Sequence, residues 1–455
     1  MPRVVICGAG IAGISTAYHL AVTRGVTHIL LVDPRPPLSL TSDKSTEAYR
    51  NWWPGPDGSM VHLMNHSIDR MEALARETNN RFLLNRRGYV YATAREDVAA
   101  ELMAAAHQTA QWGAGPVRVH DGRGQRTYVP SPAEGFTGVP PGVDIITDPQ
   151  LLRDHFPYLN PNTRLVLHVR RAGWLSAQQL GMTLLEAARE KGVRLLRGEV
   201  VGVMTQGGRV HQVRVRTHSE ELLLPADVFV NAAGPFVRDV ARFLGEEIPV
   251  YWEQHAKLAF NDYRHILPRD APLLIWSDPQ RIPWDEEERA FLAEGEETRR
   301  LVEELPAGAH VRPEGGGEST MLLMLWDYHV TRTVPRFPLE FDPLLPDVLL
   351  RGMTTLVPSL RVYWERAPKP VVDGGYYTKT EENLPLIGPM STPGAYIIGA
   401  LSGFGIMAAC GAGDLLAAHI LGEEVPSYAR AFLPARYTDP QVYPLLGAWS
   451  SQWQL

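Results

Sequence analysis

Short apolar runs alternate with helical segments and turn-rich loops along most of this chain. The first run, residues 3–7, leads through a glycine-rich turn into an amphipathic segment with Ala17, Leu20 and Ala21, and a second apolar run follows at 29–32. This order predicts a strand, a helix and a second strand. We expect further helices at 60–78, 180–191, 284–304, 346–356 and 408–421, and further strands at 88–92, 193–196, 200–203, 227–230 and 321–330, with a hairpin over 210–224.

The turn between the first two strands reads Gly-Ala-Gly-Ile-Ala-Gly at 8–13, and the second strand ends in Asp33. Gly8 permits a tight turn, Gly10 lets the backbone approach a pyrophosphate, and Gly13 lets the helix lie close to the strand. The N–H groups at the helix N-terminus attract phosphate, and an acidic residue at the end of the second strand accepts hydrogen bonds from a ribose. Together these features predict a dinucleotide-binding βαβ unit.

Two later segments have a similar character. The apolar strand at 227–230 runs into Asn-Ala-Ala-Gly-Pro-Phe at 231–236, and the segment 396–406 ends in small residues before a helix. Small residues at a strand end let a bound group approach the backbone closely. Nucleotide-binding elements therefore occur at the start, the middle and the end of the chain, which predicts a discontinuous cofactor domain with a second domain inserted in two pieces.

Composition narrows the class of protein. At 455 residues the chain is long enough for two or more domains, and its net charge of -7 argues against a nucleic-acid partner. The two cysteines, Cys7 and Cys410, fall in a predicted strand and a predicted helix, which favours buried thiols over a disulfide. No apolar stretch reaches the length of a transmembrane helix, and no signal segment precedes the first strand. We therefore expect a cytoplasmic protein.

Three motifs, in order, resemble those of the FAD-dependent D-amino-acid oxidase superfamily. They are the glycine turn at 8–13 with Asp33, Val-Asn-Ala-Ala-Gly-Pro-Phe at 230–236, and Leu-Ser-Gly-Phe-Gly-Ile at 401–406. The resemblance covers nearly the whole chain and is nearest to the branch of sarcosine oxidase, dimethylglycine dehydrogenase and dye-linked L-proline dehydrogenase. It implies an α/β and α+β fold, in which a Rossmann-like FAD-binding domain carries an inserted mixed-sheet substrate domain. The expected limits are 1–85, 165–245 and 368–435 for the FAD-binding domain, 86–164 and 246–367 for the substrate domain, and 436–455 for a C-terminal tail.

The resemblance also implies which residues contact FAD. The glycines of the first turn would lie at the pyrophosphate, Asp33 at the ribose, and the 403–406 segment near flavin O2. Covalent attachment is not expected, because Gly375 stands where monomeric sarcosine oxidase has a cysteine, and no histidine lies in 34–45, where the dimethylglycine dehydrogenase type has one. The full set for non-covalent FAD is Gly8, Gly10, Ile11, Ala12, Gly13, Asp33, Pro34, Arg35, Ser45, Thr46, Val200, Val201, Ala233, Gly234, Gly403, Phe404, Gly405 and Ile406.

Candidate substrate residues follow from the same resemblance. Arg50 matches an arginine that binds a substrate carboxylate in the sarcosine oxidase group, although a role beside the flavin or a pair with Glu47 stays open. Tyr377 matches a substrate-side tyrosine, and His255 and His329 are the histidines that we expect in acid/base or orienting roles. The sequence has no clustered ligand spacing typical of a metal site. The aromatic wall of an amine pocket is expected from Trp52, Trp326, Tyr328 and Tyr376.

The resemblance implies oxidation of a secondary or tertiary amine or amino acid, of the sarcosine, dimethylglycine or proline kind. A hydride would pass to flavin N5, and water would hydrolyse the imine. Met407 and Leu325 replace two lysines of the monomeric sarcosine oxidases, one that helps to bind the substrate carboxylate and one linked to oxygen reactivity. Lys379 could supply the missing cation or face the solvent. We therefore favour a dehydrogenase over an oxidase, with a quinone, an electron-transfer protein or O2 as acceptor.

Two other functions stay open. One is an FAD-dependent 2-hydroxy-acid dehydrogenase, which would need a general base for the hydroxyl group. The other is a flavoprotein subunit or assembly factor with little activity of its own, because a fold does not establish an activity. The acidic segment 284–304 and the tail 443–455, with Trp449 and Trp453, would then be partner surfaces. A homo-oligomer is equally compatible with the sequence.

Overall fold

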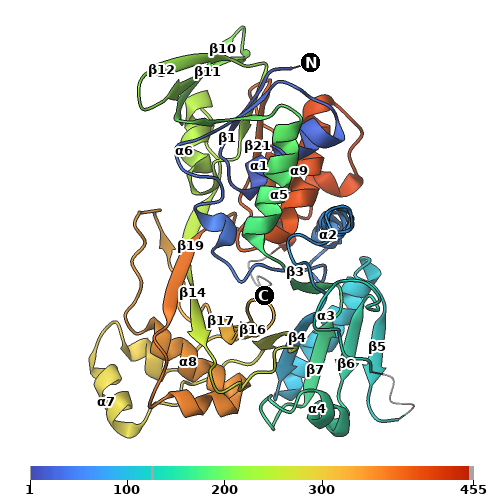
Figure 1. The fold of residues 1–455 in the computed structure, drawn as a ribbon, viewed down its shortest axis with the longest axis vertical. Coiled ribbons are helices and arrows are strands. Elements are labelled where there is room, and N and C mark those ends of the chain that lie inside the picture. Colours follow the sequence, from blue (N-terminus) through green and yellow to red (C-terminus); the bar gives the residue numbers. More distant parts are fainter. Residues whose placement is uncertain (1, 124–127, 450–455) are drawn as a thin grey trace.

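The computed structural model describes residues 2–123 and 128–449. A six-stranded sheet forms the upper half of the molecule in Figure 1, with the strand order β20-β21-β13-β1-β2-β9. All neighbours are parallel except β20 and β21. The strands are β1 (Val4–Cys7), β2 (Ile29–Asp33), β9 (Arg194–Arg197), β13 (Val228–Asn231), β20 (Leu386–Pro389) and β21 (Ala395–Gly399).

Helices cover one face of this sheet, and a small sheet covers the other. Because side chains alternate along a strand, Val4 and Ile6 of β1 pack against helices while Val5 and Cys7 pack on the opposite side. The helices of the first face are α1 (Ile11–Tyr18), α2 (Ser59–Glu77), α5 (Ala177–Glu190) and α9 (Gly405–Leu421). The second face carries α6 (Val237–Ala241) and the strands β10 (Glu199–Gln206), β11 (Arg209–Arg216) and β12 (Glu221–Pro225).

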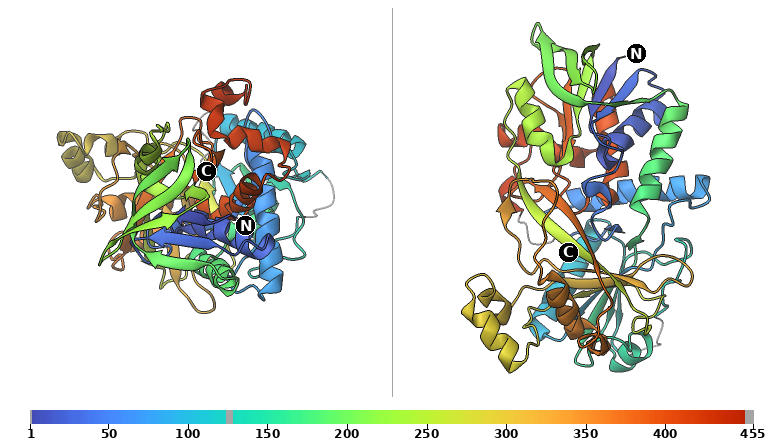
Figure 2. Two further views of the ribbon diagram at one scale, coloured as in Figure 1. Left: turned by 90° about the horizontal axis from the view of Figure 1, so that it is seen from above. Right: turned by 60° about the vertical axis from the view of Figure 1, so that its left-hand side comes forward.

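A ten-stranded mixed sheet forms the lower half. Its order is β18-β14-β17-β16-β15-β4-β7-β6-β5, and β19 also pairs with β14. The long strands β14 and β19 run from this sheet toward the upper half in both Figure 1 and Figure 2. The strands are β4 (Tyr89–Thr93), β5 (Val117–His120), β6 (Val143–Ile146), β7 (Leu165–Val169), β14 (Tyr251–Asn261), β15 (Leu273–Trp276), β16 (Ala309–Pro313), β17 (Met321–Leu325), β18 (Arg332–Thr333) and β19 (Val371–Lys379).

The two faces of the large sheet differ in chemistry. One face is apolar and packs on α8 (Leu345–Leu356), with Phe260, Val311 and Met324 in its core. Strand register places His255 and Lys257 of β14 on the same face as His310 and Arg312 of β16. All four are buried. This polar face is turned toward the first sheet, since Lys257 Nζ donates to the carbonyl oxygens of Asp43 and Ser45.

Three further α-helices and a strand pair belong to the described parts of the chain. The pair is β3 (Ala48–Arg50) with β8 (Ala172–Trp174), and it lies between the two sheets (Figure 1). The helices are α3 (Glu96–Gln111), α4 (Pro149–His155) and α7 (Glu286–Glu294). Among the described residues, no helix has both the length and the apolar character that crossing a membrane requires.

The expected elements are confirmed at most positions, including α2, α5, α8, α9, the β11–β12 hairpin and the first βαβ unit. Two segments differ. The strand expected over 321–330 ends at Leu325, where the Trp326 ring turns into the core against Gly352. The acidic segment 284–304 divides into α7 and a 3-10 turn, Arg299–Val302. The domain limits stay a prediction, although strand pairing places β7 and β19 on the large sheet.

Candidate functional site

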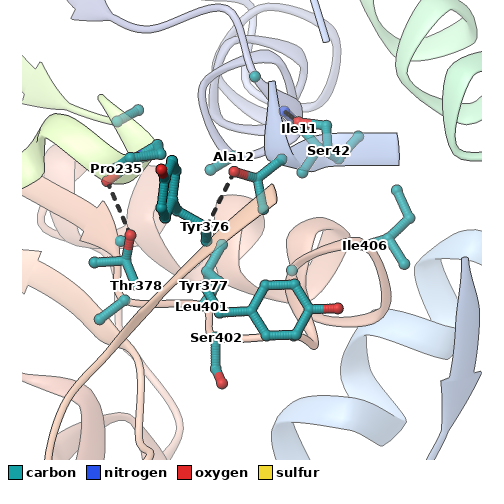
Figure 3. Close-up of a pocket in the computed structure, with 18 of the residues that line it drawn as sticks. Ile11, Ala12, Ser42, Pro235, Tyr376, Tyr377, Thr378, Leu401, Ser402 and Ile406 are labelled. Atoms are coloured by element: carbon teal, nitrogen blue, oxygen red, sulfur yellow. Dashed lines mark hydrogen bonds between the residues drawn. The ribbon is translucent and has the colours of Figure 1, made fainter. Parts of the chain in front are cut away.

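A continuous cleft runs from the carboxyl ends of β1 and β2 to β19. It consists of two cavities, one beside Asp33 and one beside Tyr377. They are here called the Asp33 end and the Tyr377 end. Figure 3 shows the Tyr377 end between the start of α1 and the strand that carries Tyr376 to Thr378. The two ends share the residues Gly10, Thr41, Ser42, Ala232, Gly234 and Pro235, so that together they form one elongated site.

The glycine turn after β1 has the shape that brings a ligand close to the backbone. Gly8 has φ +112°, and a Cβ there would lie 2.3 Å from the carbonyl oxygen of Ala232. A Cβ on Gly13 would lie 2.0 Å from the carbonyl oxygen of Gly8, so that α1 would have to move. Asp33 fixes the turn, because its carboxylate accepts the N–H groups of Ala9 and Arg35, both at 2.8 Å. These contacts hold the start of α1 at the cleft.

A second helix, α9, also begins at the cleft. Its cap residue, Phe404, makes no side-chain hydrogen bond to the first turn, and the first N–H groups of an α-helix lack intrahelical partners. Ser402 lies in the left-handed region at φ +46°, and its buried Oγ has no hydrogen-bond partner in the described parts of the chain. Gly403, Gly405 and Ile406 complete this wall. The donors suit a ligand that carries negative charge or carbonyl oxygens here.

The residues present fit FAD. An elongated cleft with a helix N-terminus near its middle and another at the Tyr377 end matches a dinucleotide whose flavin carries carbonyl oxygens. Neither Cys nor His lines the Tyr377 end among the described residues, and a Cβ at Gly375 would meet Lys44 Cβ at 3.1 Å. This lining agrees with non-covalent binding, which stays a prediction.

His255 lies directly behind the wall of the Tyr377 end. Its ring stacks on that of Tyr377, with centroids 3.9 Å apart and planes at 17°. Nδ1 donates to Asp327 Oδ1 at 2.7 Å, and Nε2 donates to Glu253 Oε2 at 3.2 Å. Burial alone would lower the pKa of His255, but the two carboxylates outweigh it and raise that pKa. Lys379 donates to Glu253 at 2.9 Å.

Two further buried cations, Arg312 and Arg50, lie on the polar face of the large sheet or against it. Arg312 donates through Nε to the carbonyl oxygen of Thr46 at 2.7 Å. The Arg50 guanidinium lies 4.6 Å from the centre of the Trp53 ring and 5.6 Å from that of Tyr89, and its Nε donates to a backbone carbonyl. Both arginines are buried, with at most 1% of either residue exposed.

His310 is the uncharged group of this face. Its Nδ1 donates to the carbonyl oxygen of Gly308 at 2.9 Å, and burial lowers its pKa. The ring is therefore neutral at neutral pH and keeps Nε2 as an acceptor.

Most of the expected FAD contacts line the cleft. Those at the Asp33 end are Gly8, Gly10, Asp33, Pro34, Arg35, Val200, Ala233 and Gly234, and those at the Tyr377 end are Ile11, Ala12, Ser45, Gly403, Gly405 and Ile406. Four lie behind the lining. Gly13 sits under the turn, Phe404 packs edge-on against Trp53, and the carbonyl groups of Thr46 and Val201 accept arginine side chains.

The expected substrate residues are divided between the site and the core. Tyr377 and Tyr376 line the cleft, although the Tyr376 hydroxyl donates to a backbone carbonyl at 2.9 Å. Trp326 and Tyr328 lie in the core beside α8, where Trp326 Nε1 donates to a carbonyl oxygen at 2.9 Å. His329 is exposed. The structure therefore does not bring these last three to the cleft.

Trp52 and Lys379 are both buried. The Trp52 ring lies 4.9 Å from that of Tyr91, in a core cluster that includes residues of α3, and it does not line the cleft. Lys379 is 4% exposed, so that it does not face the solvent. No group of His, Cys, Asp and Glu large enough to hold a metal ion occurs within the described residues.

Sequence reasoning missed Glu253, His310, Arg312 and Asp327. Each lies on the polar face of the large sheet or directly after one of its strands. A usable signal exists, because alternate residues of one strand share a face. His310 and Arg312 alternate with buried apolar residues in the strand Ala309–Pro313.

Comparisons with known proteins agree with this geometry. A family model described as FAD dependent oxidoreductase (DAO) matches residues 3–419. The mitochondrial dimethylglycine dehydrogenase of Homo sapiens is 24% identical over 449 residues, and the match covers 95% of this chain and 44% of that protein. The Mus musculus protein is also 24% identical, over 437 residues, with the same coverage. The chain thus spans less than half the length of these curated relatives.

Solved structures share the fold. The L-proline dehydrogenase from P. horikoshii superposes with a TM-score of 0.73 at 17% identity, covering 96% of this chain and 98% of that chain. The glycine oxidase from Geobacillus kaustophilus gives a TM-score of 0.71 at 18% identity, again covering 96% and 98%. At these identities the likeness establishes the architecture alone.

Proposed function

The chain belongs to the DAO family of FAD-dependent oxidoreductases, and from this premise we propose that it oxidises the C–N bond of a secondary or tertiary amine or amino acid. The observation that carries the proposal is the state of His255, whose two ring nitrogens are both bonded to carboxylates. A histidine held in this way is not available as a base. Oxidation of a neutral amine needs no base, whereas oxidation of an alcohol does. The relatives named for dimethylglycine, L-proline and glycine add support.

The residues of the site have distinct roles in this proposal. The flavin of FAD supplies the hydride acceptor. Arg50, a buried planar donor, would bind the substrate carboxylate, since a guanidinium pairs well with two carboxylate oxygens. Tyr377, which lines the cleft, would exclude water. Exclusion of water disfavours the ammonium form, so that the amine loses its proton more readily on binding.

We further propose that the enzyme acts as a dehydrogenase. Leu325 is on the polar face opposite Lys257, and Met407 lies in the first turn of α9, at positions where the monomeric sarcosine oxidases resemble this chain but have lysines. Both side chains are apolar and buried. Lys257 does not replace them, because its Nζ is bonded to the carbonyl groups of Asp43 and Ser45. A site with fewer available cations stabilises nascent superoxide less.

The test is anaerobic mixing of the yellow protein with sarcosine, dimethylglycine, L-proline and D-2-hydroxyglutarate, following the visible absorbance of oxidised flavin. Rapid bleaching by an amine, and not by the hydroxy acid, is expected. Slow recovery of the colour in air is expected from a dehydrogenase, and recovery within the mixing time would contradict that part. Bleaching by the hydroxy acid alone would overturn the amine assignment.

One observation favours a second candidate, the oxidation of a 2-hydroxy acid. His310 is neutral, lies on the polar face and keeps Nε2 as an acceptor. It could therefore take the proton of a hydroxyl group. The variant His310→Gln distinguishes the two functions, because a 2-hydroxy-acid enzyme would lose about 100-fold or more in the rate of flavin bleaching. An amine enzyme would change little in kcat at pH values where the bound amine is neutral.

A further inference from the structure

Asp327 is the more exposed of the two carboxylates that face His255. The His255 cluster is defined as Glu253, His255, Asp327 and Lys379. Asp327 Oδ1 accepts a hydrogen bond from His255 Nδ1 at 2.7 Å, while Oδ2 makes no hydrogen bond to the described parts of the chain. Its side chain is 26% exposed, against 2% for His255 and 15% for Glu253. A hydrogen-bond acceptor is thus available beside the Tyr377 wall.

The carboxylate is charged at neutral pH. Burial would raise the pKa of Asp327, but the charge and hydrogen bond of His255 outweigh it, and Lys379 lowers the pKa further. The rest of the cluster holds the carboxylate in place. Lys379 binds Glu253, Glu253 binds His255, and His255 binds Asp327, so that the chain of contacts fixes the direction of Oδ2.

The neighbours of Asp327 make its open edge suited to an amine. Tyr377, which lines the cleft, stacks on His255, and His255 donates to Asp327. Tyr89 lies against the Arg50 guanidinium. A buried guanidinium, a carboxylate and aromatic rings therefore occur on the polar face of the large sheet or against it. A ligand with a carboxylate and an N–H donor matches this set of groups.

Building on the proposed function, we propose that Asp327 accepts a hydrogen bond from the N–H of the substrate, so that the enzyme prefers amines that keep an N–H when neutral. Primary and secondary amino acids have such a hydrogen, whereas a tertiary amine such as dimethylglycine has none once it is deprotonated. Asp327 is then a specificity-determining residue, and His255 and Glu253 are positioning residues.

The test compares Asp327→Asn with Glu253→Gln as a matched control. Glu253→Gln weakens the hydrogen bond that holds His255 on its other ring nitrogen but leaves the Asp327 carboxylate unchanged. Sarcosine and dimethylglycine are the substrates, and methylthioacetate, in which sulfur replaces the N–H, is the binding probe, followed by its effect on the flavin spectrum. In Asp327→Asn we expect KM for sarcosine to rise about 10- to 100-fold, because a charge-assisted hydrogen bond is weakened. The Kd for methylthioacetate should change less than about twofold. Glu253→Gln should retain the preference for sarcosine over dimethylglycine.

Three results would overturn the inference. One is an unchanged sarcosine KM in Asp327→Asn, and another is an equal loss for sarcosine and methylthioacetate, which a merely structural role would produce. The third is a wild-type preference for dimethylglycine. Failure of the proposed function is distinct, because then no amine bleaches the wild-type flavin. Displacement of methylthioacetate by sarcosine would still measure amine binding in that case, and a Kd for sarcosine equal in wild type and Asp327→Asn would reject the role of Asp327.

Discussion

At the scale of single residues, the site depends on how buried charges are paired. His255 is 3% exposed and still favours its charged form, because carboxylates face both ring nitrogens. His310, on the same face, has only a backbone carbonyl as acceptor and favours its neutral form. Two histidines in one environment therefore differ in charge because of their partners.

The charge of His255 predicts a pH-dependent contribution to stability. A raised native pKa means that the protonated ring stabilises the fold fully below the unfolded pKa of about 6.5 and that this contribution is lost as the pH rises through the native value. The Tm difference between wild type and His255→Gln should therefore be largest at acidic pH and shrink above neutrality. Thermal unfolding of the holoenzyme at several pH values measures it. His28→Gln, at an exposed site, is the control and should change Tm little at any pH. A difference that grows with pH would contradict the charged state.

At the scale of secondary-structure elements, the approach of α1 to β1 depends on Gly13. An added Cβ would lie 2.0 Å from the Gly8 carbonyl oxygen, which is backbone and cannot move aside easily. Gly13→Ala should therefore cost about 1–3 kcal/mol and lower the FAD content, because the helix must shift away from the turn that it supports. Gly316→Ala is the control, since no atom lies within 4 Å of a Cβ there. Equal FAD content and Tm in both variants would show that the turn tolerates the shift.

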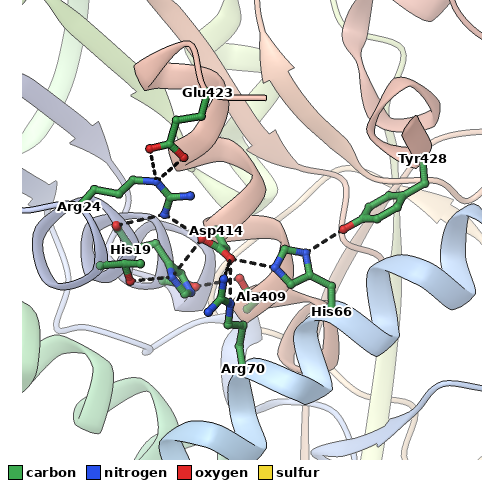
Figure 4. A network of polar contacts seen from close by, with 10 residues as sticks. His19, Arg24, His66, Arg70, Ala409, Asp414, Glu423 and Tyr428 are labelled. Atoms are coloured by element: carbon green, nitrogen blue, oxygen red, sulfur yellow. Dashed lines mark hydrogen bonds and ion pairs between the residues drawn. The ribbon is translucent and has the colours of Figure 1, made fainter. Parts of the chain in front are cut away.

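A buried carboxylate joins three helical segments behind the cleft. Asp414 of α9 accepts hydrogen bonds from Arg24 at 2.7 Å and from His66 and Arg70 at 2.8 Å, and Figure 4 shows these side chains converging on it. Its side chain is 4% exposed, and despite burial its partners hold its pKa well below the usual range. The stabilisation is therefore complete above about pH 4 and is lost as the pH falls below that value.

Asp414→Asn should lower the free energy of unfolding by about 3 kcal/mol, because it leaves buried cations without their counter-ion. Denaturant unfolding at pH 7 measures this. The surface pair Arg3–Asp227 provides the matched control, since the Asp227 side chain is 47% exposed. Asp227→Asn should cost less than about 1 kcal/mol. Similar losses in the two variants would mean that the Asp414 contacts add no more than a surface ion pair.

Local pattern was sufficient to predict the elements that bind the nucleotide, and insufficient to predict the polar face. The turn at 8–13 and the helix after 404 are encoded by neighbouring residues. Asp327 and His255, by contrast, meet only because β17 pairs with β14, 72 positions apart in sequence. An error of one residue also changes the face, since Trp326 points into the core while Asp327 points to the cluster.

At the scale of the whole molecule, the cleft joins segments that are distant in the chain. Its walls come from α1 near the start, from residues 232–236 in the middle, and from β19 and the beginning of α9 near the end. The strand β19 belongs to the large sheet, whereas α1 and α9 cover the six-stranded sheet. A ligand in this cleft therefore contacts both halves of the molecule seen in Figure 1.

This placement predicts that bound FAD stabilises the whole fold and that FAD is held without a covalent bond. A ligand that binds only the native state adds about 2.7 kcal/mol at a free concentration 100 times its Kd, so that Tm should rise with added FAD. Among the described residues, no Cys or His that could attach the flavin covalently lines the Tyr377 end. Acid precipitation should therefore leave the yellow colour in the supernatant. Riboflavin, which lacks the adenosine part that the Asp33 end would hold, is the control ligand and should raise Tm less at equal concentration. Colour that stays with the precipitate would demonstrate a covalent bond. A Tm independent of FAD in protein freed of its cofactor would mean that the two halves are held together without the ligand.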